Sequence, residues 1–214
     1  MLRRILIADD HPMCVTALTM AAHAIDPALL VDKAGTLAEA EFCARAVPHD
    51  LILLDLVLPD VQGFAGLVLM RALAPETPVA IVSSRDEETV IRQAIVLGAR
   101  GFMSKSAPLD QMIAAIRVLL GGGQWLPGAL LANPPADNAD EAGGRVGSLS
   151  VAQLRVLRAI ADGRQNKQIA YDLQLAEPTV KSHLAAIFRK LGVANRTQAV
   201  LALRALEPAE SHHG

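Results

Sequence analysis

The chain has 214 residues, of which 52% are hydrophobic, so it has enough apolar side chains for a packed core and is not disordered throughout. No apolar run approaches the ~20 residues that span a bilayer, so we expect no membrane segment and a cytoplasmic protein. The net charge of −2 conceals an uneven distribution, because residues 1–120 contain 10 basic and 14 acidic residues whereas residues 148–206 contain 9 and 3.

Five short apolar runs alternate with longer amphipathic stretches over the first 120 residues. The predicted strands are 4–8, 29–34, 51–54, 78–82 and 101–103, and the predicted helices are 12–24, 37–46, 64–74, 86–97 and 109–120. Five such units predict an α/β domain with a doubly wound, five-stranded parallel sheet, which we place at 1–122. Ligands of such a domain bind beyond the carboxyl ends of the strands.

Polar side chains stand at four of these five strand ends. Asp9 and Asp10 follow the first strand and Asp55 follows the third, so three carboxylates meet at one edge and require a cation. Oxygen ligands favour Mg²⁺. Ser83 follows the fourth strand and Lys105 the fifth. A phosphoryl group on Asp55 would therefore meet the cation, a hydroxyl and an ammonium group together.

Four segments resemble the receiver domains of response regulators, which have a flavodoxin-like fold. They are Asp9-Asp10, Asp55–Gly63, Ile81–Ser84 and Gly98–Lys105, and the resemblance covers roughly residues 1–120. It implies that Asp55 accepts a phosphoryl group from a histidine kinase. It also implies that the Val57 carbonyl joins Asp9, Asp10 and Asp55 around Mg²⁺, and that Ser83 and Phe102 form a switch pair that re-packs when phosphate arrives.

Linker composition, rich in Pro, Gly, Ala, Asn and Asp, follows the last helix of the first domain over residues 123–147. We interpret Trp125, the only tryptophan, as an anchor that pins the start of this linker to the first domain. Helical periodicity then predicts an all-α domain of four helices at 148–206, with a polar tail at 207–214. Its third helix is expected at 177–191.

That third helix has an apolar stripe and a polar face. The stripe comprises Val180, Leu184, Ile187, Phe188 and Leu191, and the polar face comprises Lys181, Ser182, Ala185 and Arg189. Such a face fits the major groove of DNA. The predicted phosphate contacts are Asn166, Lys167, Thr179, Lys190 and Arg196. A helical hairpin with a solvated basic face is the alternative interpretation.

The segments Leu149–Leu157, Gly163–Ala170, Thr179–Leu184 and Lys190–Val200 resemble the LuxR-type helix-turn-helix. With the receiver ahead of it, the chain is similar to NarL/FixJ-type response regulators. The resemblance implies a transcription regulator, not an enzyme, that binds double-stranded DNA and forms a homodimer on phosphorylation. Ala185 stands where some members carry a base-contacting polar side chain, and it offers only a methyl group.

Three other functions remain open at this point. A quorum-sensing LuxR-type regulator needs an aromatic signal pocket, and the first domain has only Phe42, Phe64 and Phe102 as aromatic residues ahead of Trp125. An α/β phosphotransferase or phosphatase for small molecules leaves the basic helical domain without a role. A receiver that is never phosphorylated is disfavoured by its intact acid cluster and Lys105.

Overall fold

The computed structural model describes residues 3–127, 145–146 and 148–204. The chain divides into two compact units, Met1–Asn138 and Ala139–Gly214, which are described separately. Most of the predicted linker and all of the predicted tail lie outside the described residues, and the exact domain bounds stay a prediction. Within the described ranges, no helix combines the length and the apolar character needed to cross a membrane.

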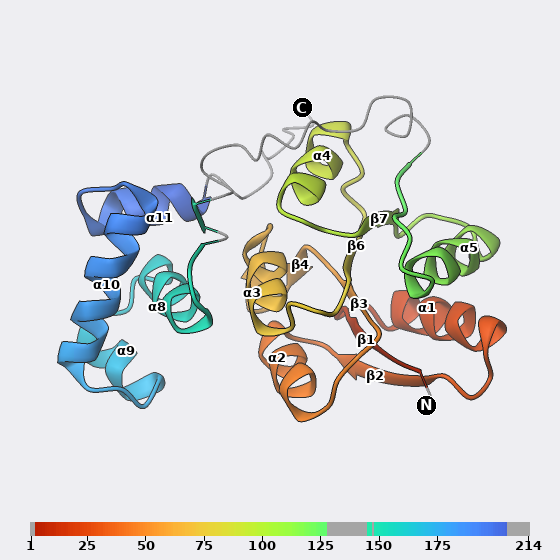
Figure 1. Cartoon of the computed structure of the whole chain (residues 1–214), viewed down its shortest axis with the longest axis horizontal. Helices are drawn as coiled ribbons and strands as arrows, with labels where there is room; N and C mark the ends of the chain where they lie inside the picture. The colour runs from red at the N-terminus through yellow and green to blue at the C-terminus, as the bar shows by residue number, and fades with distance from the viewer. Residues whose placement is uncertain (1–2, 128–144, 147, 205–214) are drawn as a thin grey trace. The chain divides into compact units, whose positions relative to one another are not determined.

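A five-stranded parallel sheet forms the centre of the first unit (Figure 1). Its strands, in the spatial order β2-β1-β3-β6-β7, are Leu30–Ala34, Arg4–Ala8, Leu51–Leu54, Val79–Ser83 and Gly101–Ser104. Each predicted strand agrees with the observed one to within one residue at either end. The strands β1, β3 and β6 are buried almost throughout, as their continuous apolar runs predict.

Helices cover both faces of this sheet (Figure 1). They are α1 (Pro12–Ile25), α2 (Leu37–Ala46), α3 (Ala65–Leu73), α4 (Glu88–Val96) and α5 (Leu109–Leu120). On one face, Leu18 of α1 and Ile116 of α5 are fully buried against the sheet residues Ile5 and Leu53. Each such side chain stabilises the fold by about 1.5–3 kcal/mol relative to an exposed one. The doubly wound α/β prediction is confirmed.

A short antiparallel hairpin that the sequence did not predict follows β3. It pairs β4 (Val57–Leu58) with β5 (Val61–Gln62). Asp60, between these strands, accepts hydrogen bonds from the backbone N–H groups of Leu37 (2.8 Å) and Ala38 (3.0 Å) in the first turn of α2. The loop that follows Asp55 is thereby tied to the start of a helix, where carboxylates are stabilised by the helix dipole.

Trp125 lies at the edge of the sheet beside β7. Its carbonyl accepts a hydrogen bond of 2.9 Å from the N–H of Phe102, and its own N–H donates to the Arg100 carbonyl at 3.3 Å. Its side chain packs against the core under α1 and α5. A Cβ on Gly101 would come within 2.8 Å of the Trp125 carbonyl oxygen, so this close approach requires glycine. The predicted anchor is confirmed.

The second unit contains four helices among its described residues, as predicted. They are α8 (Val151–Ala161), α9 (Asn166–Asp172), α10 (Glu177–Leu191) and α11 (Arg196–Arg204). A capping box starts α8: the N–H of Gln153 donates to the Ser150 hydroxyl at 3.3 Å, and the N–H of Ser150 donates to Gln153 Oε1 at 3.0 Å. Val146 is fully buried, so the packing of this unit begins ahead of residue 148.

Candidate functional site

The two acidic strand ends meet at the carboxyl edge of the sheet. Ala8 and Leu54 lie opposite each other in the β1–β3 pairing, and the N–H of Asp55 donates to the Ala8 carbonyl at 2.9 Å. Asp9 and Asp55 are both 4% exposed. One ligand atom from each of Asp9, Asp10, His11 and Asp55 lies within 4.8 Å of the others. The structure thus brings together the three carboxylates that the sequence placed at this edge.

Lys105 reaches into the same pocket from the end of β7. Its Nζ lies 2.7 Å from Asp55 Oδ2 and 2.8 Å from Asp9 Oδ2, and its side chain is 14% exposed. The backbone N–H of Lys105 donates to the Ser83 carbonyl at 2.9 Å, which fixes the start of the side chain. One ammonium group therefore bridges the two most buried carboxylates.

Burial and these ion pairs act in opposite directions on the titration of the pocket. Burial raises the pKa of Asp55 above its usual value, and the Lys105 hydrogen bond offsets only part of this effect. Burial also acts on Asp9, but hydrogen bonds with the Cys14 thiol and Lys105 outweigh it and lower the pKa of Asp9. The pKa of Lys105 is raised because its two carboxylate partners outweigh its burial.

The remaining predicted receiver residues lie on the strands β6 and β7 and in the hairpin after β3. Ser83 ends β6 with 1% exposure, and its Oγ accepts a hydrogen bond of 3.1 Å from the N–H of Arg85. Phe102 on β7 is likewise 1% exposed. Val57 donates its backbone N–H to the Asp55 carboxylate. The role of its carbonyl as a metal ligand, and the re-packing of Ser83 and Phe102, stay predictions.

His11 is a member of the pocket that the sequence analysis did not select. Its Nδ1 lies 2.7 Å from Asp10 Oδ1 and 3.1 Å from Asp9 Oδ1. The signal for it was its position directly after the two aspartates, ahead of Pro12 at the start of α1. Cys14, one turn into α1, is half-buried as a core thiol, and burial together with the Asp9 carboxylate raises its pKa to about 12.

The donor set fits a divalent cation. The Oδ2 atom of Asp9 is buried and makes no hydrogen bond, although the Lys105 ammonium lies 2.8 Å away. That ammonium offsets part of the charge, but three carboxylates share the pocket with it, and a divalent cation would reduce the repulsion among them. The oxygens of Asp9, Asp10 and Asp55 are the hard ligands that Mg²⁺ prefers.

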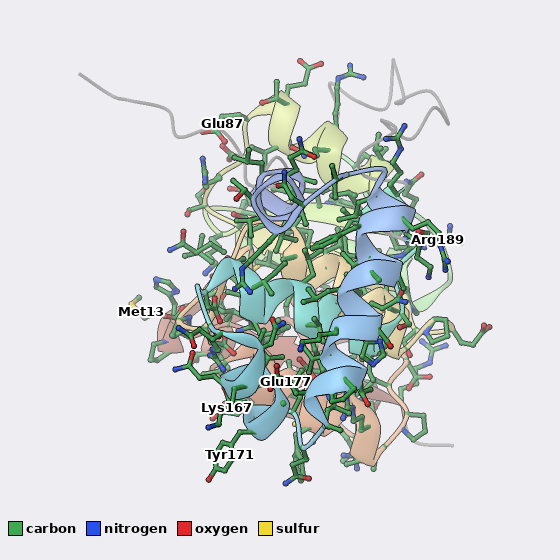
Figure 2. All side chains as sticks on the ribbon, turned by 90° about the vertical axis from the view of Figure 1, so that its left-hand side faces the viewer. Met13, Glu87, Lys167, Tyr171, Glu177 and Arg189 are labelled. Atoms are coloured by element: carbon green, nitrogen blue, oxygen red, sulfur yellow. The ribbon has the colours of Figure 1, made fainter. Side chains whose placement is uncertain are left out.

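In the second unit, α10 separates an apolar stripe from a polar face. Val180, Leu184, Ile187 and Leu191 are buried, whereas Phe188 lies at the edge of the stripe and is partly exposed. The opposite face exposes Lys181, Ser182, Ala185 and Arg189. Figure 2 shows Arg189 projecting from α10, and Lys167 and Tyr171 projecting from α9. The predicted division of this helix into a packed and a free face is confirmed.

The five predicted phosphate contacts have different surroundings. Thr179 and Lys167 are exposed and Asn166 is partly exposed at the start of α9. Lys190, in contrast, donates to the Ser148 carbonyl (2.8 Å) and to Gln153 Oε1 (2.9 Å). Arg196 donates to the carbonyls of Ile160 (3.2 Å) and Arg164 (2.6 Å). Arg196 thus binds carbonyls at and beyond the carboxyl end of α8, where helix carbonyls lack partners, whereas Lys190 binds the segment that enters α8. The DNA contacts of both residues stay predictions.

Comparison with known families agrees with both halves of this description. Residues 5–117 match the model of the response regulator receiver domain, which defines the protein as a response regulator. That match rules out a quorum-sensing signal domain for this half. Residues 147–203 match the model of bacterial regulatory proteins of the luxR family. The chain therefore belongs to the NarL/FixJ-type response regulators, in which a receiver domain is joined to a LuxR-type DNA-binding domain that regulates transcription.

Relatives cover nearly the whole chain. The glycerol metabolism activator of Pseudomonas putida is 39% identical over 92% of this chain and 93% of its own length. The Fimbriae Z protein of Salmonella typhimurium is 32% identical over 88% of this chain and 90% of its own length. A solved LuxR family DNA-binding response regulator from Silicibacter pomeroyi is 32% identical, with a TM-score of 0.53 over 60% of this chain and 99% of its own. RcsB of Salmonella typhimurium shares the fold. It is 20% identical, with a TM-score of 0.55 over 95% of this chain and 98% of its own.

Proposed function

We propose that a histidine kinase phosphorylates this response regulator on Asp55, and that the phosphoryl group controls dimerisation and sequence-specific DNA binding. The observation that carries the proposal is the position of Asp55 at the bottom of the acidic pocket, 2.7 Å from the Lys105 ammonium. A carboxylate held beside a fixed positive charge and a cation site is suited to accept a phosphoryl group. Because its target is DNA, we expect the protein to act in the cytoplasm.

The residues of the pocket define the transfer. A carboxylate oxygen of Asp55 forms the new bond to phosphorus while the bond from phosphorus to the donor's histidine nitrogen breaks, and that nitrogen leaves with the electron pair. The Lys105 ammonium, which pairs with the Asp55 carboxylate before transfer, would pair with a phosphoryl oxygen after it. The Ser83 hydroxyl, at the end of the neighbouring strand, would donate to a second oxygen. Mg²⁺ held by Asp9, Asp10 and Asp55 would neutralise the charge that gathers on the phosphoryl group.

Labelling with radioactive acetyl phosphate tests this proposal. We expect Mg²⁺-dependent incorporation into the native chain, its removal by EDTA, and no incorporation into Asp55→Asn. The matched control is Asp86→Asn, which changes an exposed aspartate ahead of α4. Undiminished labelling of Asp55→Asn would refute the assignment. Absence of labelling in the native chain would favour the receiver that is regulated without phosphorylation.

The polar face of α10 supports the second half of the proposal. Lys181 and Arg189 are exposed two turns apart on that face, and the ammonium of Lys181 pairs with Glu177 at 3.2 Å within the same helix. Such a surface ion pair contributes little to stability, so Lys181 can exchange it for DNA at small cost. Binding of duplex DNA should weaken in Lys181→Ala with the fold retained. Equal affinity of variant and native chain would contradict this role.

A further inference from the structure

We propose that His11 is a nitrogen ligand of the cation site, so that the receiver binds transition-metal ions such as Mn²⁺ through a donor that Mg²⁺ does not use. The inference rests on the proposed cation site and deepens it. The receiver resemblance supplied only oxygen ligands for this site, and the imidazole is a feature of the geometry alone.

The ring of His11 is turned into the pocket. Besides the contacts with Asp10 at 2.7 Å and Asp9 at 3.1 Å, its Nδ1 lies 3.2 Å from Lys105 Nζ and 4.0 Å from Asp55 Oδ2. One nitrogen thus reaches all three carboxylates and the ammonium group. These contacts hold the imidazole over the carboxylates, so its Nδ1 lies where an ion bound by them would be.

The backbone fixes this orientation. The N–H of His11 donates to Asp9 Oδ1 at 2.8 Å, and the residue occupies the N-cap position of α1 in an extended conformation, followed by Pro12 in the first turn. Proline restricts the backbone of the preceding residue to that extended region. The His11 side chain is 62% exposed. It therefore stands at the mouth of the pocket, where solvent and an incoming ion have access.

Ligand chemistry gives the ring a selective effect. Mg²⁺ takes oxygen ligands and keeps its waters, whereas imidazole is a ligand for first-row transition metals. An imidazole beside three carboxylates should therefore strengthen binding of a transition-metal ion and leave Mg²⁺ nearly unaffected. One ligand atom from each of Asp9, Asp10, His11 and Asp55 lies within 4.8 Å of the others, which is close enough for all four to face one ion.

Mn²⁺ is a suitable probe because free and bound Mn²⁺ differ in electron paramagnetic resonance, and electron spin echo modulation detects a directly bound ¹⁴N. The full chain would be titrated with Mn²⁺, and Mg²⁺ would then be added to displace the Mn²⁺ bound at the acidic pocket. The Mn²⁺ that Mg²⁺ displaces is the Mn²⁺ held at that site. The variant His11→Asn keeps a polar side chain at the mouth but removes the imidazole. The variant Asp55→Asn serves as the control for the cation site itself.

We expect ¹⁴N modulation from Mn²⁺ that Mg²⁺ displaces, and its loss in His11→Asn. Losing the ring should weaken Mn²⁺ binding by at least about tenfold, since removal of even an outer-shell partner of a metal ligand costs roughly 10–100-fold in affinity. Binding of Mg²⁺ should change by less than about twofold. Bound Mn²⁺ without ¹⁴N modulation, or equal weakening of both ions, would overturn the role of His11 while the cation site stands. If neither ion binds and acetyl phosphate labelling fails, the proposed function falls as well.

Discussion

Replacing Arg196 by alanine distinguishes a structural role of this residue from a DNA contact. Its guanidinium donates to the carbonyls of Ile160 and Arg164, at and just beyond the carboxyl end of α8. A hydrogen bond that involves a charged group stabilises a protein by roughly 1.5–3 kcal/mol when it is buried. One of these two is only partly buried and the other is exposed. We therefore expect a total loss of about 2 kcal/mol, which corresponds to an approximately 30-fold change in an opening equilibrium.

Hydrogen exchange of the full chain, followed by mass spectrometry, measures this change directly. Amides of α8 and α11 should exchange about 30-fold faster in Arg196→Ala, and receiver amides should not change. The matched control is Arg189→Ala, which removes an exposed arginine of α10 and should leave exchange unaltered. The salt dependence of duplex binding gives a second measurement, since each lost phosphate contact lowers its slope by about 0.9. Unchanged exchange in Arg196→Ala with a reduced slope would refute the structural role and restore the predicted phosphate contact.

Three further outcomes follow from the two domains. Burial raises the pKa of Asp32, but hydrogen bonds from Arg4 (2.9 Å) and His49 (2.8 Å) outweigh burial and lower this pKa overall. The pairing of Asp32 should therefore stabilise the receiver above a pH near 3.8, and this stabilisation should be lost as the pH falls further. Urea unfolding of Asp32→Asn should lack this acid dependence, and identical pH profiles of variant and native chain would contradict it. A fragment from Arg145 onward should bind duplex DNA at low salt, as gel shift would show, and no affinity would remove the main support for the helix-turn-helix function. Beryllofluoride should raise both the sedimenting mass and the operator affinity of the full chain, and no change in either would exclude control through dimerisation.

The sheet and the acid cluster could be predicted because both follow from one-dimensional patterns. Continuous apolar runs such as 51–54 identify buried parallel strands, and the residues directly after them must share an edge. Side chains that contact distant residues left weaker signals. Asp60 is polar and follows Pro59, which is equally typical of an ordinary turn, so its bonds to the start of α2 were not predictable.

Side-chain direction limited the prediction elsewhere. At the start of α2, Thr36–Glu39 has the sequence pattern of a capping box, and the Thr36 hydroxyl accepts from the Glu39 N–H at 3.1 Å, but the Glu39 carboxylate bonds to the Gly35 N–H at 2.7 Å. The second half of the box does not form, because a flexible glutamate can reach one residue further back. Lys190 has the charge and helix position of a phosphate contact, yet its long chain reaches the Ser148 carbonyl. Charge pattern alone does not reveal such internal partners.

The position of Trp125 beside β7 has a consequence for optical work on this protein. The chain contains one tryptophan and one tyrosine, and these lie in different units, Trp125 in the receiver and Tyr171 on α9 of the DNA-binding domain. Tyrosine emission overlaps tryptophan absorption, so the pair acts as an energy donor and acceptor. The unlabelled native chain therefore contains an intrinsic donor–acceptor pair, with one member in each domain. The efficiency of energy transfer from Tyr171 to Trp125 would report how the separation of the domains responds to a phosphoryl group or to DNA.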